Sequence, residues 1–100
     1  MKILELLTSG KCWCKNDLAK TKRGEATMPY HHDAAQWCLI GAIERCYPND
    51  YYTTHHKIEE AIVECYPEAE FDNYDLVVQF NNAKSTTFRK IRRVLRKANV

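Results

Sequence analysis

The chain has 100 residues, of which 45% are hydrophobic and 28% charged, and these proportions are those of one globular domain covering residues 1–100. With three glycines, three prolines and no apolar run longer than residues 37–43, the composition argues against a disordered chain and against a membrane-spanning helix. The formal net charge is +2, but residues 84–100 contain seven basic residues and no acidic one.

The first elements are expected to be a helix and a hairpin. Apolar residues fall on one face of a helix over residues 1–9, and Gly10 is a natural place for that helix to end. Residues 17–28 follow a less regular pattern. We expect a short β-hairpin there, with Gly24 at its turn.

Residues 33–46 have the strongest helical pattern. Asp33 and Gln36 have the spacing of a capping box at the start of a helix. The apolar residues that follow surround nearly the whole circumference, which is typical of a buried, central helix. Gly41 lowers helix stability, so we expect it to permit close packing against a neighbour.

Three further elements complete the expected fold. Residues 54–65 form an amphipathic pattern that stops before Pro67, and residues 75–80 are a short apolar element, helix or strand. Thr87 is the expected N-cap of a last helix with apolar residues on one side and basic residues on the other. The sequence therefore predicts a mainly α fold, a compact bundle of four or five helices around the helix at 33–46.

The last helix carries one set of candidate binding residues. They are Lys84, Arg89, Lys90, Arg92, Arg93, Arg96 and Lys97. Such a surface could contact nucleic-acid phosphates, an acidic protein, or the chain's own segment 59–75, which holds seven acidic residues and no basic one. No helix-turn-helix spacing is evident, and a simple solvated face is a further interpretation.

Three stretches resemble a small uncharacterised family found in phages and bacteria. They are Trp13-Cys14, residues 34–42 and Phe80-Asn81-Asn82, and a Thr-led helix follows the last. The family's pattern is roughly Trp-Cys, then Ala-x-x-Trp-Cys-Leu-x-Gly-Ala, then Trp-Asn-Asp. Here Phe80 and Asn82 replace the Trp and the Asp, so position 82 cannot supply a carboxylate base. The resemblance implies a phage accessory protein and no particular reaction.

A second set of candidate residues comes from these stretches, and we call them the motif residues. They are Trp13, Cys14, Trp37, Cys38, Asn81 and Asn82. A ligand-binding role is one interpretation; packing, turns and helix capping are the more common roles of such residues.

Two chemical alternatives involve the cysteines and histidines. Cys12 and Cys14 with His31 and His32 could supply four zinc ligands, but the spacing between the cysteines is shorter than in most structural zinc sites. Cys38 and His32 could form a nucleophile pair, although no orienting group is apparent. We therefore predict no catalytic residue, no metal site and no cofactor.

The expected function is that of a non-catalytic binding protein, namely a phage accessory factor that engages a host protein, with inhibition of a host defence system as one version. Alternatives are a nucleic-acid or nucleotide binder that uses the last helix, and a small thiol- or metal-dependent enzyme. Residues 1–7 lack the features of a signal peptide, and the five cysteines are an odd number. We expect free thiols and a location in the cytoplasm of the bacterial host, without membrane association.

Overall fold

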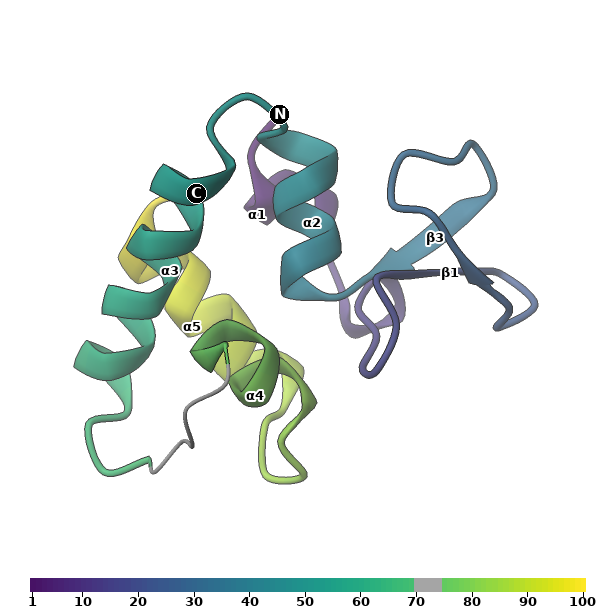
Figure 1. The fold of residues 1–100 in the computed structure, drawn as a ribbon. Coiled ribbons are helices and arrows are strands. Elements are labelled where there is room, and N and C mark those ends of the chain that lie inside the picture. The colour runs from purple at the N-terminus through teal and green to yellow at the C-terminus, as the bar shows by residue number, and fades with distance from the viewer. Residues whose placement is uncertain (70–74) are drawn as a thin grey trace.

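The computed structural model describes residues 1–69 and 75–100, and its elements are short helices and one small sheet (Figure 1). In chain order they are α1 (Ile3–Leu6), the 3₁₀ helix η1 (Gly10–Cys12), β1 (Ala19–Thr21), β2 (Ala26–Thr27), β3 (Ala34–Trp37), α2 (Leu39–Cys46), α3 (Tyr51–Cys65), α4 (Leu76–Asn82) and α5 (Phe88–Ala98). The prediction of a mainly α fold is confirmed. Of the expected architecture, the described residues support a compact, helix-dominated fold with five α-helices and one small three-stranded sheet.

Helices α3 and α5 lie side by side and form the largest part of the core (Figure 1). Ile58 and Ile62 of α3 and Ile91 and Leu95 of α5 are fully buried. The hydroxyl oxygen of Thr87 accepts a hydrogen bond from the Lys90 amide, which confirms the expected N-cap of α5.

Two helix assignments from sequence are refined by the structure. Helix α3 begins at Tyr51, one turn before the expected start at Thr54, which is itself buried inside the helix. Residues 76–82 are a helix and not a strand. The Asp75 carboxylate accepts hydrogen bonds from the amides of Val77 and Val78, and this N-cap fixes the start of α4.

The expected hairpin is present as β1 and β2, and β3 extends it to an antiparallel sheet with the strand order β2-β1-β3. Ala19 of β1 is paired with Thr27 on one side and with Trp37 on the other. Gly24 lies in the turn with a φ of 83°, a left-handed conformation that favours glycine.

The predicted helix at 33–46 is wrong in its first half. Residues 34–37 form β3, and the helix starts only at Leu39, after Cys38, whose sulfur accepts a hydrogen bond from the Gly41 amide at 3.3 Å. Asp33 therefore caps no helix. Pairing with β1 overrides the local helical pattern, because the ladder and burial on the sheet stabilise the extended backbone more than one additional helical turn would.

The expectation for Gly41 is confirmed. A Cβ atom at this position would lie 1.9 Å from the carbonyl oxygen of Leu18, so only glycine allows this approach of α2 to the end of the loop before β1. The same carbonyl accepts a hydrogen bond from the Cys38 amide at 3.2 Å. The close contact thus joins the start of α2 to the start of β1, the central strand of the sheet.

The first helix is shorter than expected. It covers Ile3–Leu6 instead of residues 1–9, and Gly10 begins the 3₁₀ helix η1 instead of ending α1. Two carbonyl oxygens at its end, those of Leu4 and Leu7, accept hydrogen bonds from Nη1 of Arg92, each at 3.1 Å. This cap from α5 explains how so short a helix is held in place.

Candidate functional site

The side chain of Asn81 joins three segments that are far apart in the sequence. Its Oδ1 accepts hydrogen bonds from Nε1 of Trp13 at 2.8 Å and from the Leu39 amide at 3.0 Å. Its Nδ2 donates to the Cys14 carbonyl at 3.1 Å and to Oδ1 of Asn82 at 2.9 Å. An amide side chain offers two donors and two acceptor positions, so all four are used, and the residue is 1% exposed.

The other motif residues surround this amide. Trp13 and Trp37 form an isolated parallel β-bridge, and the Cys14 amide donates to the Trp37 carbonyl at 3.2 Å. Nε1 of Trp37 donates to the carbonyl of Pro29 at 2.8 Å. The structure therefore brings all six motif residues together, and their hydrogen bonds are used within the chain to connect the sheet, α2 and α4.

The thiols within this group are buried and protonated at neutral pH. Burial raises the pKa of Cys14 to about 11, and the neighbouring Cys38 adds to this effect. Burial also raises the pKa of Cys38, against the opposing effect of the hydrogen bonds from the backbone at Gly41 and Ile40. A protonated, buried thiol is a poor nucleophile and a poor metal ligand, so neither cysteine has the environment of a reactive thiol.

The two chemical alternatives expected from sequence are not assembled. His32 is exposed, and its Nε2 lies 3.5 Å from the Asp33 carboxylate, an acid in its own loop. Within residues 1–69 and 75–100, the group of side chains close enough to share a metal ion is His31, His32 and Asp33, which does not include Cys12 or Cys14. The two histidine rings are stacked, with centroids 4.4 Å apart and planes at 25°. Nearly parallel rings do not direct their in-plane lone pairs to one point, so this loop is not preorganised for a metal.

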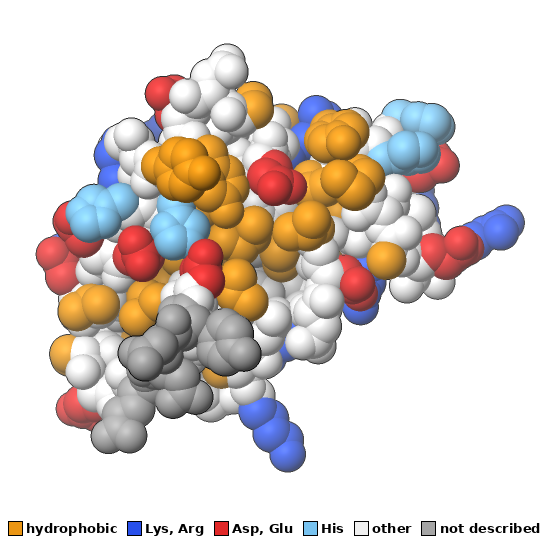
Figure 2. Space-filling view, in the orientation of Figure 1, with side chains coloured by type: hydrophobic (Ala, Val, Ile, Leu, Met, Phe, Trp, Pro, Cys, Tyr) orange, Lys and Arg blue, Asp and Glu red, His pale blue; other side chains and the backbone are white. Residues whose placement is uncertain are grey.

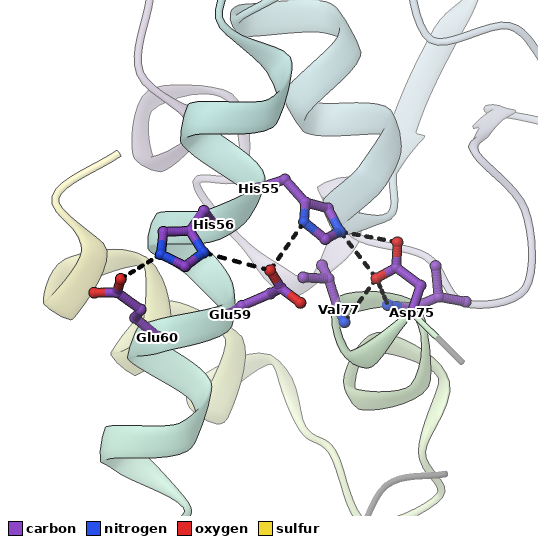
Figure 3. Close-up of polar contacts among 7 residues, drawn as sticks. His55, His56, Glu59, Glu60, Asp75 and Val77 are labelled. Carbon is purple, nitrogen blue, oxygen red and sulfur yellow. Dashed lines mark hydrogen bonds and ion pairs between the residues drawn. The ribbon is translucent and has the colours of Figure 1, made fainter. Parts of the chain in front are cut away.

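His55 on α3 lies between two carboxylates (Figure 3). Its Nε2 is 2.8 Å from the Asp75 carboxylate, and its Nδ1 is 3.4 Å from that of Glu59. Its ring also stacks on Tyr51. Because each ring nitrogen faces a carboxylate, neither is directed at an open site where it could accept a substrate proton. The residue links α3 to the capping residue of α4, a pairing that no sequence pattern indicated.

The basic residues of α5 divide into two groups. Four have partners inside the chain, because Arg92 caps α1, Nζ of Lys97 lies 3.3 Å from the Glu64 carboxylate, and Lys90 and Arg93 lie over the ring of Tyr66. Arg89 and Arg96 are exposed, as is Lys84, which lies before α5. Of the acidic segment 59–75, residues 70–74 lie outside the described part of the chain. A pairing of this segment with α5 is present at Glu64.

A small cavity of about 170 Å³ lies beside Asn81. Its lining residues are Asn16, Asp17, Leu18, Cys38, Ile40, Val78, Asn81 and Asn82. Leu18 and Val78 are 37% and 38% exposed, respectively, which are high values for apolar side chains that line a cavity. Sequence reasoning named Cys38, Asn81 and Asn82 as possible ligand residues but missed the other lining residues, because the lining comes from three segments whose proximity depends on the fold.

The polar edge of the cavity is only partly satisfied. Oδ1 of Asn82 accepts hydrogen bonds from the Asn16 amide at 2.8 Å and from Nδ2 of Asn81. Its own Nδ2 has no acceptor among the described residues. Asn82 is itself one of the residues that line the cavity.

Figure 2 shows a broad apolar face over α2, the start of α3 and the sheet. Hydrophobic side chains gather there with acidic ones between them, and Lys and Arg side chains lie at the margin. Tyr51 and Tyr52, whose rings meet edge to face with centroids 5.3 Å apart, begin α3, and Tyr52 is 85% exposed. We use "apolar face" for Leu18, Ile40, Val78, Tyr51 and Tyr52 together with the cavity.

Comparison with known proteins places the chain in a family without assigning an activity. None of the described helices is both long enough and apolar enough to cross a lipid bilayer. No curated protein and no solved structure matches the sequence. Residues 2–99 match the family of unknown function DUF6197, and the chain belongs to that family.

Proposed function

We propose that this protein is a small, non-catalytic binding module that engages a protein partner through the apolar face. The observation that carries the proposal is the cavity of about 170 Å³ with exposed Leu18 and Val78 among its lining residues. Pockets for small molecules and cofactors usually measure about 300–1,000 Å³. A cavity of about 150 Å³ accommodates a benzene-sized group, so the size observed here suits one side chain of a protein better than a complete cofactor.

The side chains that could act as nucleophile or base give further support. The buried thiols of Cys14 and Cys38 are protonated, and His55 is enclosed by two carboxylates. The exposed aromatic side chain of Tyr52 is of a type enriched at protein interfaces. On the resemblance to phage proteins, the proposed partner is a bacterial host protein in the cytoplasm, and a component of a host defence system is a narrower version of the same proposal.

The test uses two valine substitutions on exposed helical positions. Val78 lines the cavity on α4, while Val63 on α3 is 54% exposed and does not line it. Tagged wild type, Val78→Arg and Val63→Arg are used to capture proteins from nuclease-treated host lysate, and the captured proteins are quantified by mass spectrometry. We expect a captured partner to be lost with Val78→Arg and retained with Val63→Arg. Equal capture by both variants, with unchanged thermal unfolding, would rule out the apolar face.

Nucleic-acid binding through α5 is a second candidate. Arg89, Arg93 and Arg96 are exposed at spacings of four and three residues, which places them on one side of the helix. Their joint reversal to Glu leaves the cap formed by Arg92 intact. If α5 binds phosphates, the logarithm of the binding constant for an oligonucleotide should fall linearly with the logarithm of the salt concentration. Binding should disappear in the triple variant. The candidate is removed if the wild type does not bind at low salt.

A further inference from the structure

We propose that the partner segment seated on the apolar face presents one apolar anchor side chain flanked by lysine or arginine. The inference rests on the proposed function and specifies the chemistry of the partner. The geometry that carries it is the combination of a cavity of one side chain's size, an unused amide donor at its edge, and carboxylates around it.

The anchor follows from the lining of the cavity. Leu18, Ile40 and Val78 supply apolar walls, and a partner side chain that fills the space would complete the burial of the two that are more than one-third exposed. Asn82 is another lining residue, and its two Nδ2 donors have no acceptor among the described residues. A backbone carbonyl next to the anchor residue would satisfy one of them. A segment of protein chain offers both groups at the required short separation.

The charge preference follows from the acidic residues near the cavity. Asp17 is the one charged residue among the described residues that line it, and its carboxylate is 39% exposed. Glu44 acts electrostatically on Cys38, another lining residue, and both Glu44 and Asp75 act on Tyr51. Two of these three acids have partners within the chain, because Nζ of Lys20 is 3.8 Å from the Asp17 carboxylate and Nε2 of His55 is 2.8 Å from the Asp75 carboxylate. Since like charges across an interface are unfavourable, a basic segment is preferred over an acidic one.

A second copy of this chain fits the face less well. Its basic surface is α5, and no large hydrophobic side chain of α5 is among the exposed ones in the described residues. Helix α5 of another copy would therefore bring charge without an anchor. We accordingly assign the face to a different protein.

A display library of random twelve-residue peptides tests this chemistry even while the partner is unidentified. Peptides are selected on wild-type protein and counter-selected on Val78→Arg, with Val63→Arg as the matched variant that should still bind them. We expect enriched peptides with a large apolar residue and a lysine or arginine within four positions of it. Enrichment of acidic or uncharged peptides would overturn the charge assignment, and failure to enrich any peptide that depends on Val78 would overturn the inference as a whole.

Charge exchange on one selected peptide gives the quantitative test. Replacing its lysines and arginines by glutamate should weaken binding at least tenfold, as measured by calorimetry. With Asp17→Lys, the preference for the basic peptide over its glutamate form should be smaller than with the wild type. Glu68→Lys, an exposed acid that does not line the cavity, is the matched control and should leave the preference unchanged. A change of less than twofold on exchange would contradict the inference.

Two outcomes separate this inference from the proposed function. Capture of a partner that depends on Val78, combined with peptides that are not basic, would leave the proposed function standing and remove the inference. A concentration-dependent dimer in analytical ultracentrifugation that Val78→Arg abolishes would show that a second copy occupies the face, and would overturn both the assignment of the partner and the anchor chemistry.

Discussion

At the scale of single residues, the amide of Asn81 accounts for much of the local structure. Its Oδ1 accepts a hydrogen bond from the amide of Leu39, the first residue of α2. An amide in the first turn of a helix has no partner within its own helix. Trp13 places its indole N–H in the same buried region, where an unpaired donor would be costly. One asparagine therefore satisfies the start of α2, a tryptophan from the segment before β1 and the Cys14 carbonyl.

Substitution of Asn81 should destabilise the protein strongly. Asn81→Ala leaves the indole of Trp13 and the Leu39 amide without their acceptor and the Cys14 carbonyl without its donor. Each unsatisfied buried group costs about 1–3 kcal/mol, so we expect a loss of about 3 kcal/mol or more in the free energy of unfolding, measured by urea denaturation. Asn49→Ala, at an exposed loop position, should change it by less than about 0.5 kcal/mol. Similar midpoints for the two variants would show that the network contributes little.

The cysteines should differ sharply in reactivity. Burial raises the pKa of Cys12, but hydrogen bonds from Thr8 and Ser9 outweigh it, and the net pKa is lowered. Burial raises the pKa of Cys14 to about 11 and also raises that of Cys38. In the folded protein at pH 7.5, iodoacetamide should therefore modify Cys12 much faster than Cys14 or Cys38, as measured by peptide mass spectrometry. If Cys14 in the folded protein were modified as fast as in protein unfolded by urea, this would contradict its buried environment.

The raised pKa of Cys14 also predicts a stability change at alkaline pH. The unfolded thiol ionises near its ordinary pKa of 9.0 and the folded thiol near about 11, so the contribution is complete below pH 9 and is lost as the pH rises toward 11. Each pKa unit corresponds to about 1.4 kcal/mol. Urea midpoints of wild type should fall more steeply over this range than those of Cys14→Ala. Parallel curves would refute the assignment.

At the scale of elements, the join between the sheet and α2 is decided by the contact at Gly41. The Gly41 amide donates to the sulfur of Cys38, and the position of its missing Cβ is filled by the Leu18 carbonyl. Glycine and a short N-capping side chain are therefore both needed where the chain changes from strand to helix.

Two glycine substitutions test this join. In Gly41→Ala the new Cβ would lie 1.9 Å from a backbone oxygen, which cannot move without loss of the hydrogen bond from Cys38. We expect a loss of about 1–3 kcal/mol or more in unfolding free energy, as for overpacked sites. In Gly10→Ala the nearest atom is Cβ of Phe88 at 3.7 Å, an ordinary contact, so its stability should be close to wild type. Thermal unfolding followed by circular dichroism would compare the two, and equal Tm values would contradict the close packing at Gly41.

The same element shows the limit of local sequence patterns. The hairpin at β1 and β2 was predictable from its turn, because Gly24 lies at a position with positive φ. Strand β3 was not, because its partner β1 is separated from it by the whole of β2 and a loop. The two neighbouring apolar residues have different roles: Trp37 is buried at the end of a strand, and Cys38 caps the helix that follows. A single continuous helix was the wrong interpretation of that run.

At the scale of the whole molecule, the described elements are stabilised unequally. The pair α3 and α5 has five fully buried large side chains, which are Ile58, Ile62, Ile91, Val94 and Leu95. The sheet, in contrast, consists of strands of three, two and four residues. Stability to local opening follows the density of buried apolar contacts.

Hydrogen exchange should reveal this difference. We expect the slowest amides in the middle of α3 and α5, with exchange close to the global unfolding limit, and faster exchange in β1 and β2 at every denaturant concentration below the unfolding transition. The measurement is native-state exchange followed by NMR. Equal protection of Ala19 in β1 and Ile62 in α3 would contradict it, because it would show that the sheet opens only when the helices unfold.

The sequence by itself determined the mainly α character, the hairpin turn and the cap at Thr87, because each depends on residues close together in the chain. The sequence also indicated close packing at Gly41, but the fold supplies the neighbour, which is the carbonyl of Leu18. Only the tertiary structure decided that residues 34–37 form a strand, that Arg92 caps α1, and that Asn81 joins the motif residues. It also created the cavity between Leu18 and Val78. These features depend on contacts between distant segments, whose free energies outweigh local preferences and leave no periodic signal in the sequence.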